Sequence, residues 1–405
     1  MELKLPLLLD AATGTELQKH GMPAGVCSEQ WTLEHPEAIV EIQKGYIEAG
    51  SRAVYTPTFG ANRVKLEANH IFNKTTEYNK RLAALAREAA GDKALVAGDI
   101  APTGQFLYPL GNTTFEEFVE IYTEQAAALE EAGVDFFVIE TMMTVAEARA
   151  ALLAVRSVSK KPVFVSFTCD ENGRTLTGCD VTAVLEIMQG MGADAFGLNC
   201  SVGPDKMVTQ LKRLGKTARV PLIAKANAGM PQLINGKTVY DCPPEEYTAY
   251  VEEMAAAGVM IFGGCCGTDA SHIAALKEKL AHAVLKKPDP EYADRLPAAT
   301  EKEVFYLDPS ARWLSVLPCT PELEDTLEDA LADEGDLVAI AIGSGEELDT
   351  FADYQYMITK PLCLVCEDAD VLEKALRLYQ GRALYEGNLP EEVLKPLSEK
   401  YGLIY

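Results

Sequence analysis

Short runs of apolar residues alternate with amphipathic segments over the first 285 residues of the chain. Several of the apolar runs are continuous, which is typical of parallel strands that are buried on both faces. Glycine follows some of the amphipathic segments, as at Gly133 and Gly258, where it can take the left-handed conformation that ends a helix. The pattern predicts strands at Leu5–Leu9, Ala53–Thr56, Ala94–Ile100, Phe136–Thr141, Val163–Thr168, Ala195–Cys200, Leu222–Asn227 and Met260–Cys265, and helices at Pro36–Ala49, Phe115–Ala132, Val145–Ser157, Pro244–Ala257 and Ala270–Leu280.

Eight strand–helix units within about 285 residues match a (β/α)8 TIM barrel in both number and length. A doubly wound open sheet is the alternative α/β architecture. The even number of units favours the barrel, as do polar residues at the ends of many different strands. In a barrel these strand ends meet at one face, so residues far apart in the sequence are brought together there.

The last part of the chain has a different character. A proline-bearing stretch, 286–300, is expected to be a linker. Residues 301–405 are expected to form a smaller α/β domain with strands at Leu337–Ile342 and Leu362–Val365 and a helix at Ala369–Tyr379. This segment holds 23 acidic and 8 basic residues. A solvated acidic face and a docking surface for a partner both explain that excess.

Composition narrows the possible partners and surroundings. The net charge of −25 over 405 residues argues against nucleic acid and anionic membranes as partners, because both are polyanions. We find no apolar run of the ~20 residues that a membrane span needs, and the first ten residues lack the features of a secretory signal. Ten cysteines are too sparse for a disulfide scaffold. The chain is therefore expected in the reducing cytoplasm, where clustered thiols indicate metal binding or catalysis.

Three of the cysteines lie in glycine-flanked runs after predicted strands, namely Cys200 after the sixth and Cys265 and Cys266 after the eighth. Three thiolates can hold a tetrahedral zinc ion and leave its fourth position for a ligand, which is the arrangement of a catalytic site. A small thiol substrate fits that position. Buried apolar cysteines and a vicinal disulfide between Cys265 and Cys266 are the structural alternatives. The other seven are expected to be packing residues: Cys27, Cys169, Cys179, Cys242, Cys319, Cys363 and Cys366.

Acidic residues follow two other predicted strands. Asp10 precedes a turn of small residues, Ala11 to Thr15, whose backbone N–H groups could hold a carboxylate. Glu140 ends an apolar run, where a carboxylate is costly unless it is paired, and the sequence shows no obvious buried cation to pair with it. Together the two acidic residues could bind the ammonium group of an amino acid. Asp10 could equally cap the first helix.

These motifs identify a resemblance that runs in order along residues 1–285. They are Asp10–Thr15, Thr58–Arg63, Glu140-Thr141, Gly197–Cys200, Asn227–Gly229 and Gly263–Thr268. The segment resembles the homocysteine-binding zinc barrel shared by cobalamin-dependent methionine synthase, betaine–homocysteine methyltransferase and S-methylmethionine-type methyltransferases. The methionine synthase branch is the most similar.

The resemblance implies a function and roles for individual residues. It implies a zinc-dependent methyltransferase that forms methionine from homocysteine, with methyl-corrinoid on a separate protein as donor. A sulfonium or betaine donor, another thiol acceptor, and a zinc-dependent adaptor without activity are the alternatives. By resemblance, Cys200, Cys265 and Cys266 are the catalytic zinc ligands, and the substrate-binding residues are Asp10 and Glu140 for the amino group, Ala11, Thr13 and Gly14 in the turn for the carboxylate, and Asn199.

The chain also departs from the family pattern. Ala11 and Thr13 replace a usual glycine and methionine, and Ala226 replaces a usual proline. Tyr55 stands where an acidic residue is frequent, and Pro57 replaces a common asparagine. None of these positions is an expected zinc ligand. Tyr55 and Pro57 lie near the expected substrate mouth, so they bear on which thiol fits.

The C-terminal segment resembles the family only in part. The stretch 360–383 is similar to part of a folate-binding barrel, but Val365 and Cys366 stand where that barrel tends to have Asp-Thr. The chain shows no Asp-x-His-x-x-Gly corrinoid motif. We therefore expect residues 301–405 to be a degenerate folate-domain remnant that packs or recruits a partner.

Overall fold

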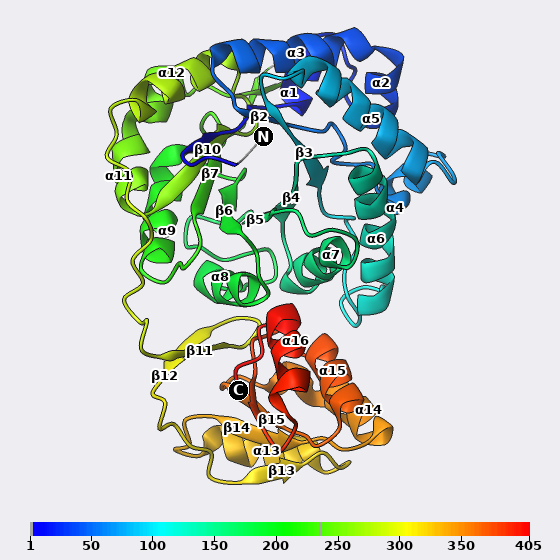
Figure 1. The fold of residues 1–405 in the computed structure, drawn as a ribbon, viewed down its shortest axis with the longest axis vertical. Coiled ribbons are helices and arrows are strands. Elements are labelled where there is room, and N and C mark those ends of the chain that lie inside the picture. Colours follow the sequence, from blue (N-terminus) through cyan, green and yellow to red (C-terminus); the bar gives the residue numbers. More distant parts are fainter. Residues whose placement is uncertain (1–2, 235–236) are drawn as a thin grey trace. The chain divides into compact units, whose positions relative to one another are not determined.

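The chain folds around an eight-stranded parallel sheet that curls into a (β/α)8 barrel (Figure 1). The structure, a computed structural model, describes residues 3–234 and 237–405. The sheet order is β1-β10-β7-β6-β5-β4-β3-β2, and the N–H of Arg52 donates to the carbonyl of Leu8 (2.7 Å) where the two outer strands meet. The strands are β1 (Leu7–Leu8), β2 (Ala53–Tyr55), β3 (Leu95–Ile100), β4 (Phe136–Met142), β5 (Val163–Phe167), β6 (Ala195–Asn199), β7 (Leu222–Ala226) and β10 (Val259–Gly264).

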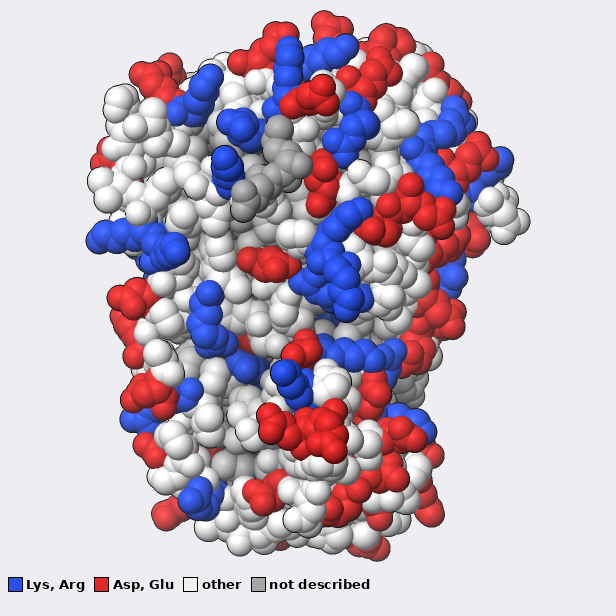
Figure 2. Space-filling model, viewed as in Figure 1, with Lys and Arg blue, Asp and Glu red and all other residues white. Residues whose placement is uncertain are grey.

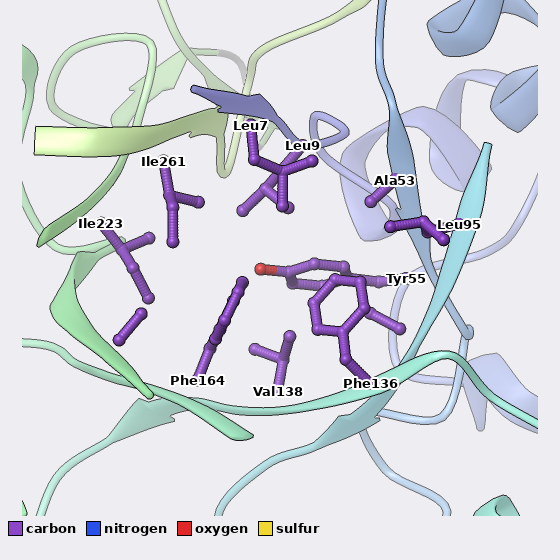
Figure 3. Close-up of a cluster of buried hydrophobic side chains, with 12 residues drawn as sticks. Leu7, Leu9, Ala53, Tyr55, Leu95, Phe136, Val138, Phe164, Ile223 and Ile261 are labelled. Carbon is purple, nitrogen blue, oxygen red and sulfur yellow. The ribbon is translucent and has the colours of Figure 1, made fainter. Parts of the chain in front are cut away.

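All eight predicted strands are confirmed, each within two residues at its ends. The packing of the barrel interior explains why the strands could be predicted from the apolar runs. Every second residue of a strand points inward, and these residues form one apolar cluster that includes Leu95, Phe136, Phe164 and Ile223 (Figure 3). Burial on both faces of the sheet keeps the runs apolar, and this is why the strands could be located from the sequence.

Helices connect the strands and cover the barrel. The predicted helices Pro36–Ala49 and Ala270–Leu280 are confirmed at both ends, whereas Pro244–Ala257 is divided by a 3-10 turn at Thr248–Tyr250. The helices are α1 (Gly14–Lys19), α2 (Ser28–Glu34), α3 (Pro36–Ala49), α4 (Arg63–Ala68), α5 (Thr75–Ala90), α6 (Phe115–Glu131), α7 (Val145–Val158), α8 (Val181–Gly190), α9 (Pro204–Gly215), α10 (Pro244–Tyr247), α11 (Val251–Ala256) and α12 (Ala270–Leu280). A small antiparallel hairpin, β8 (Gln232–Ile234) and β9 (Lys237–Val239), follows β7.

The chain divides into two compact units, residues 1–177 with 194–289 and residues 178–193 with 290–405. The second unit has a four-stranded parallel sheet, in the order β13-β14-β15-β16, and an antiparallel pair, β11 with β12. Its elements after α8 are β11 (Leu296–Ala299), β12 (Val304–Leu307), β13 (Val316–Pro318), α13 (Leu323–Ala332), β14 (Val338–Ala341), α14 (Gly345–Tyr354), β15 (Leu362–Val365), α15 (Ala369–Leu378), β16 (Leu384–Glu386) and α16 (Glu391–Tyr401).

The two strands and the helix predicted for the C-terminal segment are present as β14, β15 and α15. Strand β11 lies inside the stretch predicted as a linker. The predicted boundaries, 1–285, 286–300 and 301–405, stay a prediction. The surface view shows many acidic side chains over the C-terminal elements (Figure 2).

Helix α8 follows β5 in the sequence but groups with the second unit. Its residues 181–188 are all buried, which is unusual for a helix and requires partners around it. The fully buried carboxylate of Glu186 accepts a hydrogen bond from Tyr306 Oη (3.2 Å) and pairs with Arg382 Nη1 (3.5 Å). Within the described ranges, no helix is long and apolar enough to cross a membrane.

Candidate active site and metal centre

At the carboxyl ends of the barrel strands, the inward-facing residues change from apolar to polar. Leu95 and Ala97 on β3 belong to the apolar interior, and Asp99 is the next residue with the same parity. Glu140 continues β4 in the same way, and Lys225 continues β7 after Ile223. All three side chains line one cavity of about 250 Å³. The alternation that builds the core therefore also brings these charges to one place.

Three thiols meet at this end of the barrel. The sulfur atoms of Cys200, Cys265 and Cys266 all lie within 4.8 Å of one another, and the Sγ atoms of Cys200 and Cys266 are 3.9 Å apart. All three are free thiols, so the vicinal disulfide is not formed. Sulfurs around a tetrahedral zinc ion with bonds of about 2.3 Å lie about 3.8 Å apart. The donor set and its spacing fit zinc, and the predicted convergence of the three cysteines is present.

The backbone at the cluster is held in an uncommon conformation. Cys200 and Ser201, which follow β6, have φ values of 60° and 59°, and Thr141 in β4 has a φ of 59°. Non-glycine residues with positive φ cost about 1–3 kcal/mol each and persist where the surroundings fix them. At Thr141 the Asn199 carboxamide does so, because its Oδ1 accepts from the Thr141 N–H (2.9 Å) and its Nδ2 donates to Thr141 Oγ1 (2.6 Å).

Asn199 was predicted as a substrate-binding residue, and its contacts give it a positioning role between β4 and β6. Its Oδ1 also accepts from Ser166 Oγ on β5 (2.9 Å). Its Nδ2 lies 3.5 Å from Glu140 Oε2 and 4.0 Å from Cys265 Sγ. The amide thus joins the predicted ammonium receptor to the thiol cluster.

Within the thiol cluster the three side chains share their protons unequally. Hydrogen bonds from Cys200 and Cys265 lower the pKa of the Cys266 thiol to about 3. The same contacts raise the pKa of Cys265 well above its usual value. One thiolate therefore forms readily among the three, and a cation that replaces the shared protons would stabilise all of them as thiolates.

Asp10 does not cap the first helix. Its Oδ2 accepts from the Tyr55 N–H (2.7 Å) and its Oδ1 lies 3.0 Å from Lys225 Nζ. The cap position of α1 is Thr13, which makes no side-chain cap bond. The helix-cap alternative is therefore wrong, and both carboxylate oxygens of Asp10 are already engaged.

Lys225 is a buried cation in this pocket, and the sequence reasoning overlooked it. Its side chain is 4% exposed, and its Nζ lies 3.6 Å from the centre of the Tyr55 ring as well as beside Asp10. Gly263 on the neighbouring β10 makes room for it, because a Cβ there would lie 3.0 Å from Lys225 Cγ. Burial is the largest effect on Lys225 and lowers its pKa, but the acidic groups around it, Asp10 first, together raise the pKa well above its usual value, so the group stays an ammonium. A lysine within the apolar run Leu222–Ala226 was the available signal.

Asp99 is a second residue that the sequence reasoning missed. Its side chain is buried, and its Oδ1 has no hydrogen-bond partner among the described residues. Burial is the main cause that raises the pKa of Asp99, followed by the nearby carboxylate of Glu140. Burial likewise raises the pKa of Glu140 to about 7, and Lys225 opposes that increase. The cost of a carboxylate in an apolar run, which drew attention to Glu140, applied equally to Asp99.

The remaining predicted residues also surround the cavity. Its lining includes the turn residues Ala11, Thr13 and Gly14, together with Tyr55 and Pro57, two of the family departures. Ala226 acts through its carbonyl, which accepts from the Cys265 N–H (2.8 Å). The structure therefore brings together nearly all the residues that the sequence placed at the site, and it adds Asp99 and Lys225.

Fold and site together define a barrel enzyme with a three-thiol centre beside an acidic pocket. Residues 7–280 match the family model of homocysteine S-methyltransferase. The chain therefore belongs to the homocysteine S-methyltransferase family, and the predicted membership of a methyltransferase family is confirmed.

Individual relatives agree with this assignment. The chain is 32% identical over 298 residues to methionine synthase of Mycobacterium tuberculosis and 33% identical over 284 residues to that of Mycobacterium leprae. These matches cover 69% and 65% of this chain but only 25% and 23% of the relatives. The oxidized form of the homocysteine methyltransferase MmuM from Escherichia coli has a similar fold, with a TM-score of 0.58, 25% identity, and coverage of 67% of this chain and 95% of that one.

Proposed function

We propose that this chain transfers a methyl group to the thiol of homocysteine and so forms methionine, with a zinc ion held by Cys200, Cys265 and Cys266. The observation that supports this most directly is the cluster of three free thiols on the wall of a buried acidic cavity. The family membership and the methionine synthase relatives support the same reaction. Another thiol acceptor is the second candidate, because Tyr55 and Pro57 line the cavity.

The three thiols fit zinc in donor type and spacing, and zinc bound there would supply an acidic centre at which a substrate thiol loses its proton. The chain's own residues do the rest. Carboxylates attract the substrate ammonium group, and the turn of Ala11, Thr13 and Gly14 faces the cavity where the substrate carboxylate would lie. Asn199 holds the β4 and β6 ends together beside the thiols. These residues would orient the substrate thiol toward the methyl donor. That orientation is the main catalytic role of the protein.

The proposed methyl donor is methyl-corrinoid on a separate protein, and a sulfonium or betaine donor is the alternative. The matched part of the methionine synthase relatives is about a quarter of their length, so their donor chemistry comes to this chain only as a proposal. We also propose that residues 301–405 are a degenerate folate-domain remnant. The parallel β13–β16 sheet with helices between its strands supports an α/β origin. A cytoplasmic location is proposed because all ten cysteines are free thiols.

A donor-exchange assay tests the proposal. Zinc-loaded protein is incubated with homocysteine and, in turn, methylcobalamin, S-methylmethionine and betaine, and methionine is measured by mass spectrometry. Methionine is expected with methylcobalamin. Formation only with another donor would replace the donor assignment. No methionine from any donor, together with no change in metal coordination on adding homocysteine, would favour the zinc-dependent adaptor and overturn the proposed reaction.

A further inference from the structure

A site with three cysteine thiolates must direct a methyl group to the substrate sulfur and not to its own sulfurs. A thiolate is a nucleophile as well as a metal ligand. Methyl transfer to Cys266 would form an S–CH3 bond there, while the leaving group of the donor departs with its electron pair. The resulting thioether carries no charge, so the site would lose one of its three thiolate ligands.

Each cysteine sulfur of the cluster has a hydrogen-bond donor that is not another thiol. The donors are the backbone N–H of Ser201 for Cys200, the Asn199 carboxamide for Cys265 (Nδ2 to Sγ, 4.0 Å) and the Tyr240 side chain for Cys266. A hydrogen bond stabilises the charge on a thiolate, and a less basic thiolate is a weaker nucleophile. All three ligand sulfurs are therefore less reactive than their charge alone implies.

These donors reach the sulfurs from outside the cavity. The three cysteines all belong to its lining, whereas Asn199, Ser201 and Tyr240 are not among the described residues that line it. A substrate thiol that enters the cavity meets the cysteines on a side that these donors do not occupy. Its sulfur therefore receives none of the three hydrogen bonds.

Tyr240 is held in place by the loops that follow β7 and β10. Its ring packs on Gly267, where the φ is 81° and a Cβ would lie 2.3 Å from Tyr240 Cγ. Two residues further on, the Cys242 N–H donates to the carbonyl of Ala228 (3.1 Å), and the Cys242 carbonyl accepts from His272 Nε2 (3.1 Å). The glycine directly after Cys266 thus makes room for the ring whose hydroxyl reaches that cysteine.

We propose that Tyr240 is a positioning residue that protects Cys266 from methylation, as Asn199 and the Ser201 N–H protect Cys265 and Cys200, so that the substrate thiol receives the methyl group. The inference rests on the proposed function, because it presumes bound zinc and a methyl donor. It adds a role for the loop after β7, which selects the reacting sulfur without contacting the substrate.

Methyl iodide tests the protection directly, because a thiolate sulfur displaces its iodide and no substrate site is needed. Zinc-loaded protein is treated without homocysteine, and peptide mass spectrometry follows methylation of each cysteine with time. Tyr240→Phe keeps the ring on Gly267 and removes the hydroxyl. The rate at Cys266 should rise about 3–10-fold, since thiolate nucleophilicity follows basicity only in part, and the rates at Cys200 and Cys265 should not change.

Tyr356→Phe is the matched control, because Tyr356 is an exposed tyrosine of the second unit. Its methylation pattern should equal that of the unmodified protein, and all three proteins should contain the same amount of zinc at the start. An unchanged rate at Cys266 in Tyr240→Phe, or an equal rise at all three cysteines, would overturn the proposal. Lack of methionine from every donor would reject the proposed function alone, because methylation by methyl iodide requires neither the donor nor homocysteine.

Discussion

The barrel sheet and the four-stranded sheet of the second unit are both parallel, and cysteines lie in or directly after their strands in very different surroundings. In the barrel, Cys265 and Cys266 follow β10 and line the cavity at the carboxyl ends of the strands. In the second unit, Cys363 lies within β15 in an apolar cluster, and burial raises its pKa to about 12. A cysteine that follows a strand at a cavity can therefore be reactive, whereas a cysteine packed inside a sheet is inert.

Among the predicted effects, the largest should follow from removing one of the barrel thiols. In Cys266→Ala, two thiols remain, and zinc affinity should fall by more than about 100-fold, since even groups behind a metal ligand change affinity by 10–100-fold. Metal content after dialysis, measured by mass spectrometry, should drop to near zero together with methionine formation. Full zinc occupancy in this variant would mean that Cys266 is not a ligand.

The next effect concerns the buried ion pair between Lys225 and Asp10 in the barrel. Lys225→Met should destabilise the protein by about 3–5 kcal/mol, because it leaves Asp10 buried without its cation. Denaturant unfolding measures the loss, and the double variant Asp10→Asn with Lys225→Met should recover most of it. A single variant as stable as the unmodified protein would show that the ion pair is dispensable.

Glu140 makes the stability of the metal-free protein depend on pH. Its pKa is raised from 4.5 to about 7, mainly by burial, so the folded state binds its proton more tightly than the unfolded state. Between these values unfolding releases a proton, and stability therefore decreases as pH rises, by at most about 3 kcal/mol.

Glu140→Gln removes that titration. Urea unfolding of both metal-free proteins at pH 5 and pH 8 should show the variant gaining relative to the unmodified protein at pH 8. An equal difference at the two pH values would contradict the raised pKa.

The smallest effect is expected in the second unit. Cys366 is buried, and its Sγ donates to the carbonyl of Asp368 (3.1 Å). Cys366→Ala should cost about 1–2 kcal/mol and leave zinc content and methionine formation unchanged. It is also the size-matched control for Cys266→Ala. Loss of zinc in Cys366→Ala would show that the two groups of cysteines are not separate.

Sequence reasoning found the barrel because burial on both faces leaves a simple apolar pattern. It found the three clustered thiols and Glu140 because those residue types are unusual next to glycines or in apolar runs. It missed Lys225, which looked like one charge in a strand until the parity of β7 placed it with Ile223 inside the barrel. The pairing of Lys225 with Asp10 joins residues 215 positions apart, and no local pattern encodes such a contact.

The second unit was harder to predict for a related reason. Its short strands β13 and β16 have three residues each, too few for a clear period. The grouping of α8 with this unit depends on Glu186 meeting Tyr306 and Arg382, which lie more than 100 residues further along the chain. Which unit a helix packs against is determined by such long-range contacts rather than by its local sequence.

The membership of α8 in the second unit constrains where the chain can be truncated. The second unit begins inside the barrel's own sequence, between β5 and β6, and continues only after residue 289. Deletion of residues 290–405 would strip the partners from a helix whose residues 181–188 are buried, and the exposed apolar surface would favour aggregation. Residues 290–405 therefore cannot be removed without exposing a helix that belongs to the barrel's own stretch of sequence.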